Sequence, residues 1–233
     1  RATERSASND AFAISASLDR DGRELTPEEI FDGRYTSDGH QVFRVTPIAQ
    51  GGSYSAEDRL AAAYGMLDLA VTQKIRLVAG ARLERSQVTV DAQSTLGQPV
   101  RTSPSYTDLL PSLSVNWALT QQQTLRLSAS QTLSRPEYRE LAPVQYREVL
   151  GGDNVVGNAD LQRSLIRNLD LRWEWYPTPA EAVSVAFFAK SFQDPIERIF
   201  LGTSGTRIIT FTNAEAAHNY GVELELRKGL GFV

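Results

Sequence analysis

The sequence contains no cysteine and only two histidines in 233 residues. The lack of cysteine excludes a disulfide scaffold, a thiol nucleophile and a cysteine zinc site. His40 and His218 lie far apart, so this chain alone cannot build a multi-histidine metal site. Asp19–Gly22 and Gly152–Asn154 carry oxygen ligands at calcium-like spacing, but the twelve-residue calcium loop pattern is missing. We therefore predict neither a metal site nor a cofactor.

Long apolar runs are missing as well. The most apolar run, Ala61–Val71, is short and contains Asp68, whereas a membrane-spanning helix needs roughly 18 apolar residues. This lack does not exclude the membrane, because the strands of a transmembrane barrel carry a much weaker signal per segment. The chain begins at Arg1 without a signal peptide and ends at Gly231-Phe232-Val233. We therefore expect a segment cut from a longer protein.

Charge and composition argue against several classes of function. The net charge of −4 disfavours an electrostatic nucleic-acid binder, and the hydrophobic fraction of 41% is ordinary for a folded protein. Gly202-Thr203-Ser204-Gly205 does not match a nucleophile elbow, because its second glycine comes one residue too early, and it is interpreted as a hairpin turn. No activated acid–base partner is evident. We predict that the chain is not an enzyme.

Alternation of apolar and polar residues is the main pattern that is present. In Leu113–Leu119 every second residue is apolar and most of the residues between are polar, and Leu125–Ala129 repeats this after a few glutamines. The same period of two recurs in Ile75–Leu83, Leu169–Trp175, Val183–Ala189 and Tyr220–Leu226. Period two predicts strands. Arms of about ten residues are long for a soluble strand and suit a tilted strand that crosses a bilayer.

Short and long connections alternate between these strands. Short turns are predicted near Thr72–Gln73, Gln121–Gln123, Pro177–Glu181 and Lys228–Gly231. Longer connections are predicted over about Asp10–Ser55, Asp91–Thr107 and Arg135–Ser164, with a shorter one near Pro195–Gly205. A meander with short turns at one end and long loops at the other is typical of transmembrane barrels. A soluble sandwich has no reason to keep this order.

The segment from Ser55 to Val71 fits two structures. Ser55 with Asp58 resembles a capping box, and Leu60, Tyr64 and Leu67 fall at helical spacing. As a strand, its apolar residues change parity, which predicts a bulge near Gly65–Met66. Periodicity alone leaves helix and strand equal, although the short link to the next strand favours a hairpin.

The two faces of the predicted strands leave two environments open. In a soluble all-β module the apolar face would cover a core, and in an outer-membrane barrel it would face lipid. The apolar faces carry aromatic residues near strand ends, as in the girdles of membrane barrels, although a sandwich core would look similar. Before any family is considered, the residues favour an all-β, antiparallel up-and-down transmembrane β-barrel.

Several segments together resemble one family. TonB-dependent outer-membrane receptors have similar segments, which here are Ala61 to Ser86, including Gly80-Ala81-Arg82-Leu83-Glu84, and Gln131 to Pro143, Gly157 to Tyr176, Ala182 to Ile199 and Asn213 to Leu230. The match covers nearly everything from Tyr54 onward in the right order and spacing. Ala159 departs from the family, which usually has proline there.

The resemblance implies a fold and a task. It implies that residues 1–233 form a single segment of about eight strands from a larger, 22-stranded β-barrel domain with a plugged lumen. The plug domain, the TonB box, the signal peptide and the remaining strands are expected to lie outside the sequence. The expected function is active uptake across the outer membrane of a scarce ligand such as a ferric siderophore, cobalamin, haem or a glycan. The alternatives are a passive porin or adhesin barrel and a soluble β-rich binding module.

The resemblance also implies partners and site residues. The partners are the lipid bilayer, the plug, the TonB complex and a small ligand, without nucleic acid. Arginine and tyrosine in long loops suit anionic or catecholate ligands; the loop candidates are Arg20, Arg23, Arg34, Tyr35, Tyr138, Arg139, Tyr146 and Arg147. The residues expected to face the lumen are Arg76, Arg82, Glu84, Arg126, Arg172, Glu174, Glu223 and Glu225. Those expected to face lipid are Trp117, Trp173, Trp175, Phe187 and Tyr220.

Overall fold

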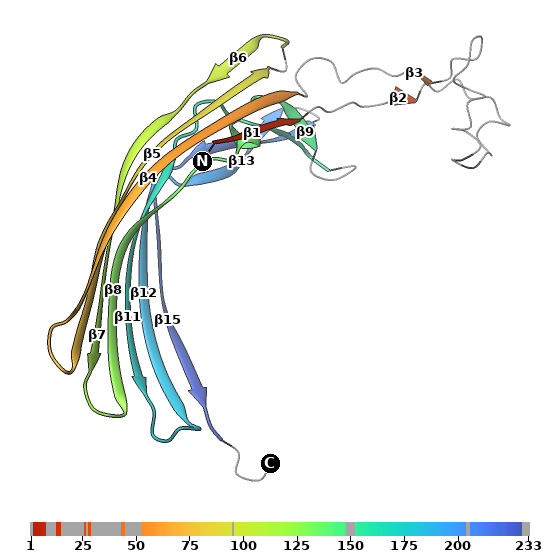
Figure 1. Cartoon of the computed structure of the whole chain (residues 1–233). Helices are drawn as coiled ribbons and strands as arrows, with labels where there is room; N and C mark the ends of the chain where they lie inside the picture. Colours follow the sequence, from red (N-terminus) through yellow and green to blue (C-terminus); the bar gives the residue numbers. More distant parts are fainter. Residues whose placement is uncertain are drawn as a thin grey trace.

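The computed structural model is dominated by one curved antiparallel sheet (Figure 1). The structure describes residues 2–7, 13–14, 26, 28, 43–44, 53–94, 96–147, 152–203 and 206–229. Eight strands follow one path through the nine-stranded sheet, in chain order: β1 (Ala2–Ala7), β4 (Tyr54–Ala70), β5 (Ile75–Gln93), β7 (Ser105–Ala118), β8 (Gln123–Ser134), β11 (Ser164–Trp175), β12 (Ala182–Gln193) and β15 (Ala216–Arg227). β6 (Pro99–Thr102) pairs with β5. The up-and-down meander of about eight strands is therefore confirmed.

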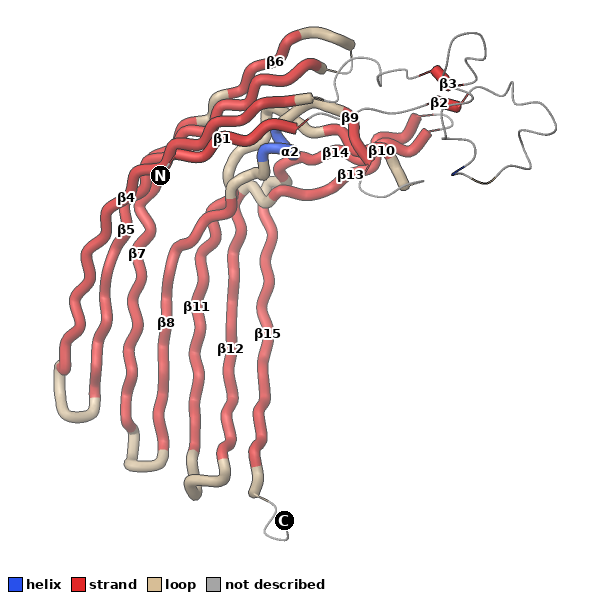
Figure 2. Tube along the Cα trace, turned by 45° about the vertical axis from the view of Figure 1, so that its right-hand side comes forward, coloured by secondary structure: helices blue, strands red, loops and turns tan. Residues whose placement is uncertain are grey.

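The two ends of the sheet differ in their connections (Figure 2). At the short-turn end, tight turns join β4 to β5, β7 to β8, and β11 to β12. The Thr72 hydroxyl accepts hydrogen bonds from the backbone N–H groups of Lys74 and Ile75, which closes the first turn. The opposite end carries the long connections, and we call it the loop end. The predicted alternation of short and long connections is confirmed for these strands.

β4 resolves the segment that fitted both helix and strand. It runs as a strand through all 17 residues from Tyr54 to Ala70 and pairs with β5 without a break in register. The bulge predicted near Gly65–Met66 is wrong. The face that carries Ala61, Ala63 and Leu67 is apolar from Ala61 to Leu69, so no change of parity is needed there, and Tyr64 turns to the face shared with Arg82.

β7 and β8 separate at Pro111. Their pairing runs from Ala118 to Ser112 and stops there, although both strands continue toward the loop end. The β5–β7 ladder passes through Pro111 unbroken, so the side of the proline that lacks an N–H faces β8. Beyond it the Gln131 side chain donates a 3.0 Å hydrogen bond to the Leu109 carbonyl in place of backbone pairing.

Two long connections fold together into a unit that we call the loop unit. It contains α2 (Tyr138–Leu141) and a four-stranded sheet in the order β13 (Ile196–Thr203), β14 (Thr206–Asn213), β10 (Asn154–Val156) and β9 (Gln145–Arg147). β13 and β14 form the hairpin predicted at Gly202–Gly205. The expected connection of Pro195–Gly205 was too short, because this hairpin extends it to Asp194–Glu215. β2 (Ala13–Ile14) and β3 (Phe43–Arg44) form a separate pair.

The described core lies between the loop unit and the sheet. Leu141, Val144, Val155 and Phe211 of the loop unit are buried with Val90 and its neighbours on β4 and β5. Figure 1 shows β9 and β13 on the concave side of the sheet. Away from this cluster the opposite face of the sheet is rich in exposed large apolar side chains. Among the described residues, no helix has the length and apolarity needed to cross a membrane.

Candidate functional site: a polar wall with loops folded against it

Strand pairing sorts the residues singled out from the sequence onto two faces. Directly paired residues of antiparallel strands point to the same side of a sheet. The eight residues expected in the lumen share one face, which we call the polar wall: Arg76, Arg82, Glu84, Arg126, Arg172, Glu174, Glu223 and Glu225. The five aromatic residues expected at lipid share the other, which we call the apolar face: Trp117, Trp173, Trp175, Phe187 and Tyr220. The loop unit lies over the polar wall, which is therefore the concave face.

The apolar face is continuous from strand to strand. One cross-strand row joins Ile75, Trp117, Leu125, Trp173, Val185 and Leu224. Trp173 and Trp175 stack with ring centroids 6.5 Å apart, and the Trp173 indole donates a 3.3 Å hydrogen bond to the Gln123 side chain. Phe187 is 51% exposed and Tyr220 80% exposed. An exposed apolar surface of this extent marks contact with a lipid or protein partner.

The edge of the apolar face slopes across the sheet. On β11 the first charged residue of this face is Arg167, six residues from Trp173. On β5 it is Arg85, ten residues from Ile75, although Ile75 and Trp173 belong to one row. At about 3.3 Å per residue, the edge rises by roughly 13 Å over three strand spacings of about 4.8 Å. It therefore runs at roughly 40° to the rows, close to the strand tilt of a barrel.

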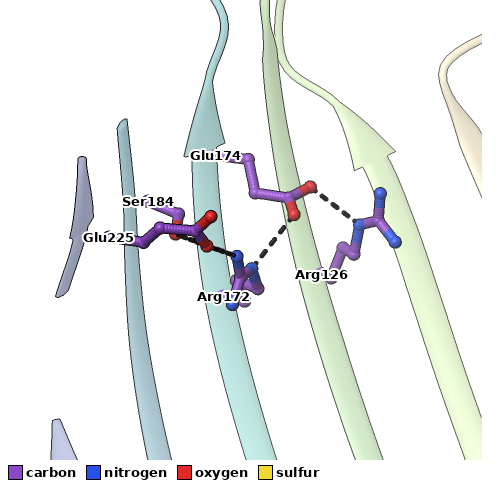
Figure 3. A network of polar contacts seen from close by, with 5 residues as sticks. All are labelled: Arg126, Arg172, Glu174, Ser184 and Glu225. Carbon is purple, nitrogen blue, oxygen red and sulfur yellow. Dashed lines mark hydrogen bonds and ion pairs between the residues drawn. The ribbon is translucent and has the colours of Figure 1, made fainter. Parts of the chain in front are cut away.

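A charge network covers the polar wall near the short-turn end (Figure 3). Arg126 and Arg172 are direct cross-strand partners, so two positive charges lie side by side. Glu174 compensates both, with its carboxylate oxygens 2.9 Å from Arg126 Nε and 3.0 Å from Arg172 Nε. Arg172 Nη2 also donates to Glu225 at 2.8 Å and to the Ser184 hydroxyl at 2.9 Å. The network joins β8, β11, β12 and β15 and contains two charges of each sign.

Smaller ion pairs extend the polar wall across β4 and β5. Arg76 donates two hydrogen bonds to the Asp68 carboxylate, of 2.8 and 2.6 Å. Arg82 donates a 2.6 Å hydrogen bond to Glu84. The charged side chains of Arg76, Asp68, Arg82 and Glu84 on the polar wall are therefore paired with one another.

Two buried carboxylates anchor the loop unit to the polar wall. Glu84 and Asp108 are cross-strand partners on β5 and β7 and are 8% and 4% exposed. Arg135, at the beginning of the connection from β8, donates a 2.6 Å hydrogen bond to Glu84. Arg163, at its end, donates a 2.6 Å hydrogen bond to Asp108, and its guanidinium lies 4.7 Å from the Tyr106 ring centroid. These arginines bridge the place where β7 and β8 have separated.

Sequence reasoning missed this anchor. Asp108, Arg135 and Arg163 were not among the predicted site residues, because a single sequence gives no distance between side chains so far apart. One signal was present, since Arg135 comes directly after Ser134 and Arg163 directly before Ser164, and these two serines pair across neighbouring strands. Residues at matching ends of a long connection are brought together whenever its flanking strands pair.

The four described loop candidates differ in burial and in their contacts. Tyr146 is 9% exposed and belongs to the core, and Tyr138 is partly buried against that core with its hydroxyl 3.3 Å from Asp58. Arg139 lies over the Tyr146 ring at 4.9 Å and is exposed. Arg147 is exposed and donates a 2.8 Å hydrogen bond to the Asn154 side chain. The other candidates, Arg20, Arg23, Arg34 and Tyr35, lie outside the described residues.

An apolar pocket opens on the polar wall beside β13. Ile166, Phe192, Pro195 and Ile196 are among the residues that line this cavity of about 300 Å³. Ile166 and Phe192 are cross-strand partners on the same face as Arg172. The wall is therefore charged near the short turns and partly apolar near the loop unit. In the described part of the chain, no group of three or more histidine, aspartate or glutamate side chains is placed to hold a metal ion.

Comparisons with known proteins agree with this architecture. The family model of the TonB-dependent receptor β-barrel matches residues 5–232. Among solved structures, the copper transporter OprC is similar with a TM-score of 0.60 at 17% identity, over 76% of this chain and 27% of that one. The Serratia marcescens hemophore receptor HasR, solved with HasA and heme, gives a TM-score of 0.54 at 15% identity, over 76% of this chain and 32% of that one. A comparison with curated proteins gave no match.

At these identities the solved structures establish the fold alone, and the chain spans about a third or less of their length. The family model, in contrast, covers nearly the whole sequence. The curved meander, its short turns and its long folded loops are those of a partial transmembrane β-barrel. The chain thus belongs to the family of TonB-dependent receptors, as part of their β-barrel.

Proposed function

We propose that this chain forms part of the wall of an outer-membrane active transporter that takes up a scarce ligand with energy delivered through TonB. The observation that carries the proposal is the division of one sheet into a sloping, exposed apolar face and a polar wall covered by loops. A soluble sandwich would cover the apolar face with a second sheet, and a slope near the tilt of barrel strands would have no cause. The apolar face would contact lipid, and the polar wall would face the lumen.

The charge pairs support an interior that is wet or filled by protein. Arginine and glutamate on a lipid face are costly, whereas paired charges on a lumen wall are tolerated. A plug domain elsewhere in the full protein would contact this wall. The described wall therefore suits a lumen that holds a plug, and the TonB complex would act on that plug.

Exposed residues at the loop end would contact the ligand. Arg139 and Arg147 are the described loop candidates with exposed guanidinium groups, and arginine binds carboxylate and catecholate ligands through charge and stacking. Tyr146 would act by holding Arg139 in place, and Tyr138 by fixing the loop unit through the core and Asp58. Arg20, Arg23, Arg34 and Tyr35 stay predictions. The two structural relatives differ in cargo, copper in one and heme in the other, so the shared fold does not select a ligand.

An uptake assay tests the proposal. Cells that carry or lack the full-length gene would be given labelled ferric siderophores, haem, cobalamin or glycans in turn. We expect uptake of one ligand class that depends on the gene, and that stops when the TonB protein is deleted. Gene-dependent uptake that continues without TonB would contradict active transport and would favour a passive porin.

The loop candidates can be tested in the same assay. Replacing Arg139 and Arg147 by glutamine should raise the ligand concentration at half-maximal uptake, because two charged donors are lost. The matched control is Arg101→Gln, which removes one exposed arginine of β6 whose side chain is paired with Asp91 on the face opposite the loop unit. Equal behaviour of both variants would remove Arg139 and Arg147 from the proposed ligand site.

A further inference from the structure

Three arginines follow the sloping edge of the apolar face. They are Arg59 on β4, Arg85 on β5 and Arg167 on β11. Each is exposed, and each is the first charged residue of its strand on this face, counted from the short-turn end. Arg85 is ten residues from the row of Trp117, and Arg59 pairs with Gln87, two residues further. The three arginines lie in different cross-strand rows, but all of them lie on the sloping edge of the apolar face.

The surroundings of these arginines leave positive charge unbalanced. The cross-strand partners of Arg85 are Ala61 and Thr107, and those of Arg167 are Gln131 and Ser191. None of these four described partners is acidic. Arg59 differs, because Glu57 accepts a 2.6 Å hydrogen bond from it. The charges of Arg85 and Arg167 are therefore not balanced by an acid among these cross-strand partners, whereas Arg59 is paired with Glu57.

The composition of the two edges is different. At the short-turn end the border of the apolar face carries Trp117, Trp173 and Trp175. At the loop end its border carries arginines and Tyr220. Guanidinium groups that adjoin an apolar surface can bury their stems on it and hold their charge at its border. Their planar donors match phosphate oxygens in pairs.

We propose that Arg59, Arg85 and Arg167 form a headgroup-binding girdle for anionic, phosphate-bearing lipids of the leaflet on the loop side. The apolar face would hold the acyl chains, and the arginines would bind the phosphates where those chains end. This inference rests on the proposed membrane orientation, since it requires the apolar face to be in lipid. The charge complementarity and the continuity with the apolar face select a lipid over a free anion.

Lipid selectivity at the protein surface tests the girdle. The full-length receptor would be reconstituted in phosphatidylcholine vesicles with spin-labelled phosphatidic acid or spin-labelled phosphatidylcholine. The motionally restricted fraction gives the relative association constant of the two lipids. Since an arginine near an anionic surface contributes about fivefold in association, we expect a clear preference for phosphatidic acid. The variant Arg59→Gln/Arg85→Gln/Arg167→Gln should lower the preference to about one, with Arg59→Gln alone having the smallest effect.

The matched control removes three arginines that lie on the loop unit: Arg139→Gln/Arg147→Gln/Arg207→Gln. It changes the net charge equally and should keep the preference. A preference that survives in the girdle variant, or that falls equally in the control, would overturn the proposal. Replacing chloride by inorganic phosphate at constant ionic strength should leave the preference intact, and its loss there would indicate a free-anion site instead. Absence of any restricted lipid would contradict the membrane assignment itself, which separates the two failures.

Discussion

At the scale of residues, burial decides which charges matter. Asp108 and Glu84 are nearly inaccessible and depend on arginines from the loop unit, whereas the Arg101–Asp91 pair is 3.6 Å long and exposed. Breaking a buried ion pair leaves an unpaired charge away from water, which is costly, whereas exposed ion pairs contribute little to the free energy of unfolding. The stability of the loop unit should therefore depend on Arg135 and Arg163 more than on any exposed arginine.

Replacing Arg163 by leucine should loosen the loop unit, because it leaves the Asp108 carboxylate buried and unpaired. We expect the free energy that protects the amides of α2 from hydrogen exchange to fall by about 3 kcal/mol. Arg101→Gln serves as the control and should change that protection little. Equal protection in the two variants would show that the buried pair does not anchor the loops.

Neighbouring residues on opposite faces give a second test. Val185 belongs to the row of Trp173, whereas Ala186 is paired with Arg172 and Glu223 on the polar wall. Val185→Arg should cost about 2–4 kcal/mol of unfolding free energy in lipid if it lies near the midplane, because the charge enters hydrocarbon. Ala186→Arg should cost much less, with Glu223 opposite it. Denaturant titration of the full receptor in vesicles measures both, and equal losses would contradict the assigned faces.

At the scale of elements, the strands could be predicted and the loop unit could not. The apolar and polar periods of β5, β7, β8, β11, β12 and β15 are regular because one face of each strand has a single environment. β4 misled the parity argument because Tyr64 and Met66 occupy the polar wall. The loop unit joins residues from two separate connections, and its contacts depend on the strands that bring those connections together. Local pattern carries no information on such contacts.

A glycine inside the loop unit tests how tightly it is built. A Cβ atom on Gly157 would overlap the carbonyl oxygen of Ala142 and lie 2.6 Å from that of Arg139, whereas Gly202 has open space. Gly157→Ala should therefore push β10 away from α2 and raise the rate at which a protease cleaves residues 136–163. Gly202→Ala should leave that rate unchanged. A Gly157→Ala protein as resistant as the wild type would mean that the loop unit is not closely packed at this point.

At the scale of the whole molecule, the described sheet is an open arc. β1 and β15 each have one partner along the path, so two edges and a broad apolar face are unpaired in the described part of the chain. Open edges and exposed apolar surface favour association. Residues 1–233 expressed alone should therefore aggregate in buffer without detergent, as judged by size-exclusion chromatography. A sharp monomer peak with cooperative melting would favour the soluble module instead.

The central claim is that the apolar face contacts lipid and the polar wall faces the lumen. This chain has no cysteine, so single thiols can be placed without background from it. The most direct measurement compares Leu127→Cys with Ser128→Cys in the full receptor, each labelled with an environment-sensitive fluorophore in vesicles that contain brominated lipid. Leu127 belongs to the apolar face and Ser128 to the polar wall. We predict blue-shifted, quenched emission at position 127 and unquenched emission at 128; equal or reversed quenching would contradict the account.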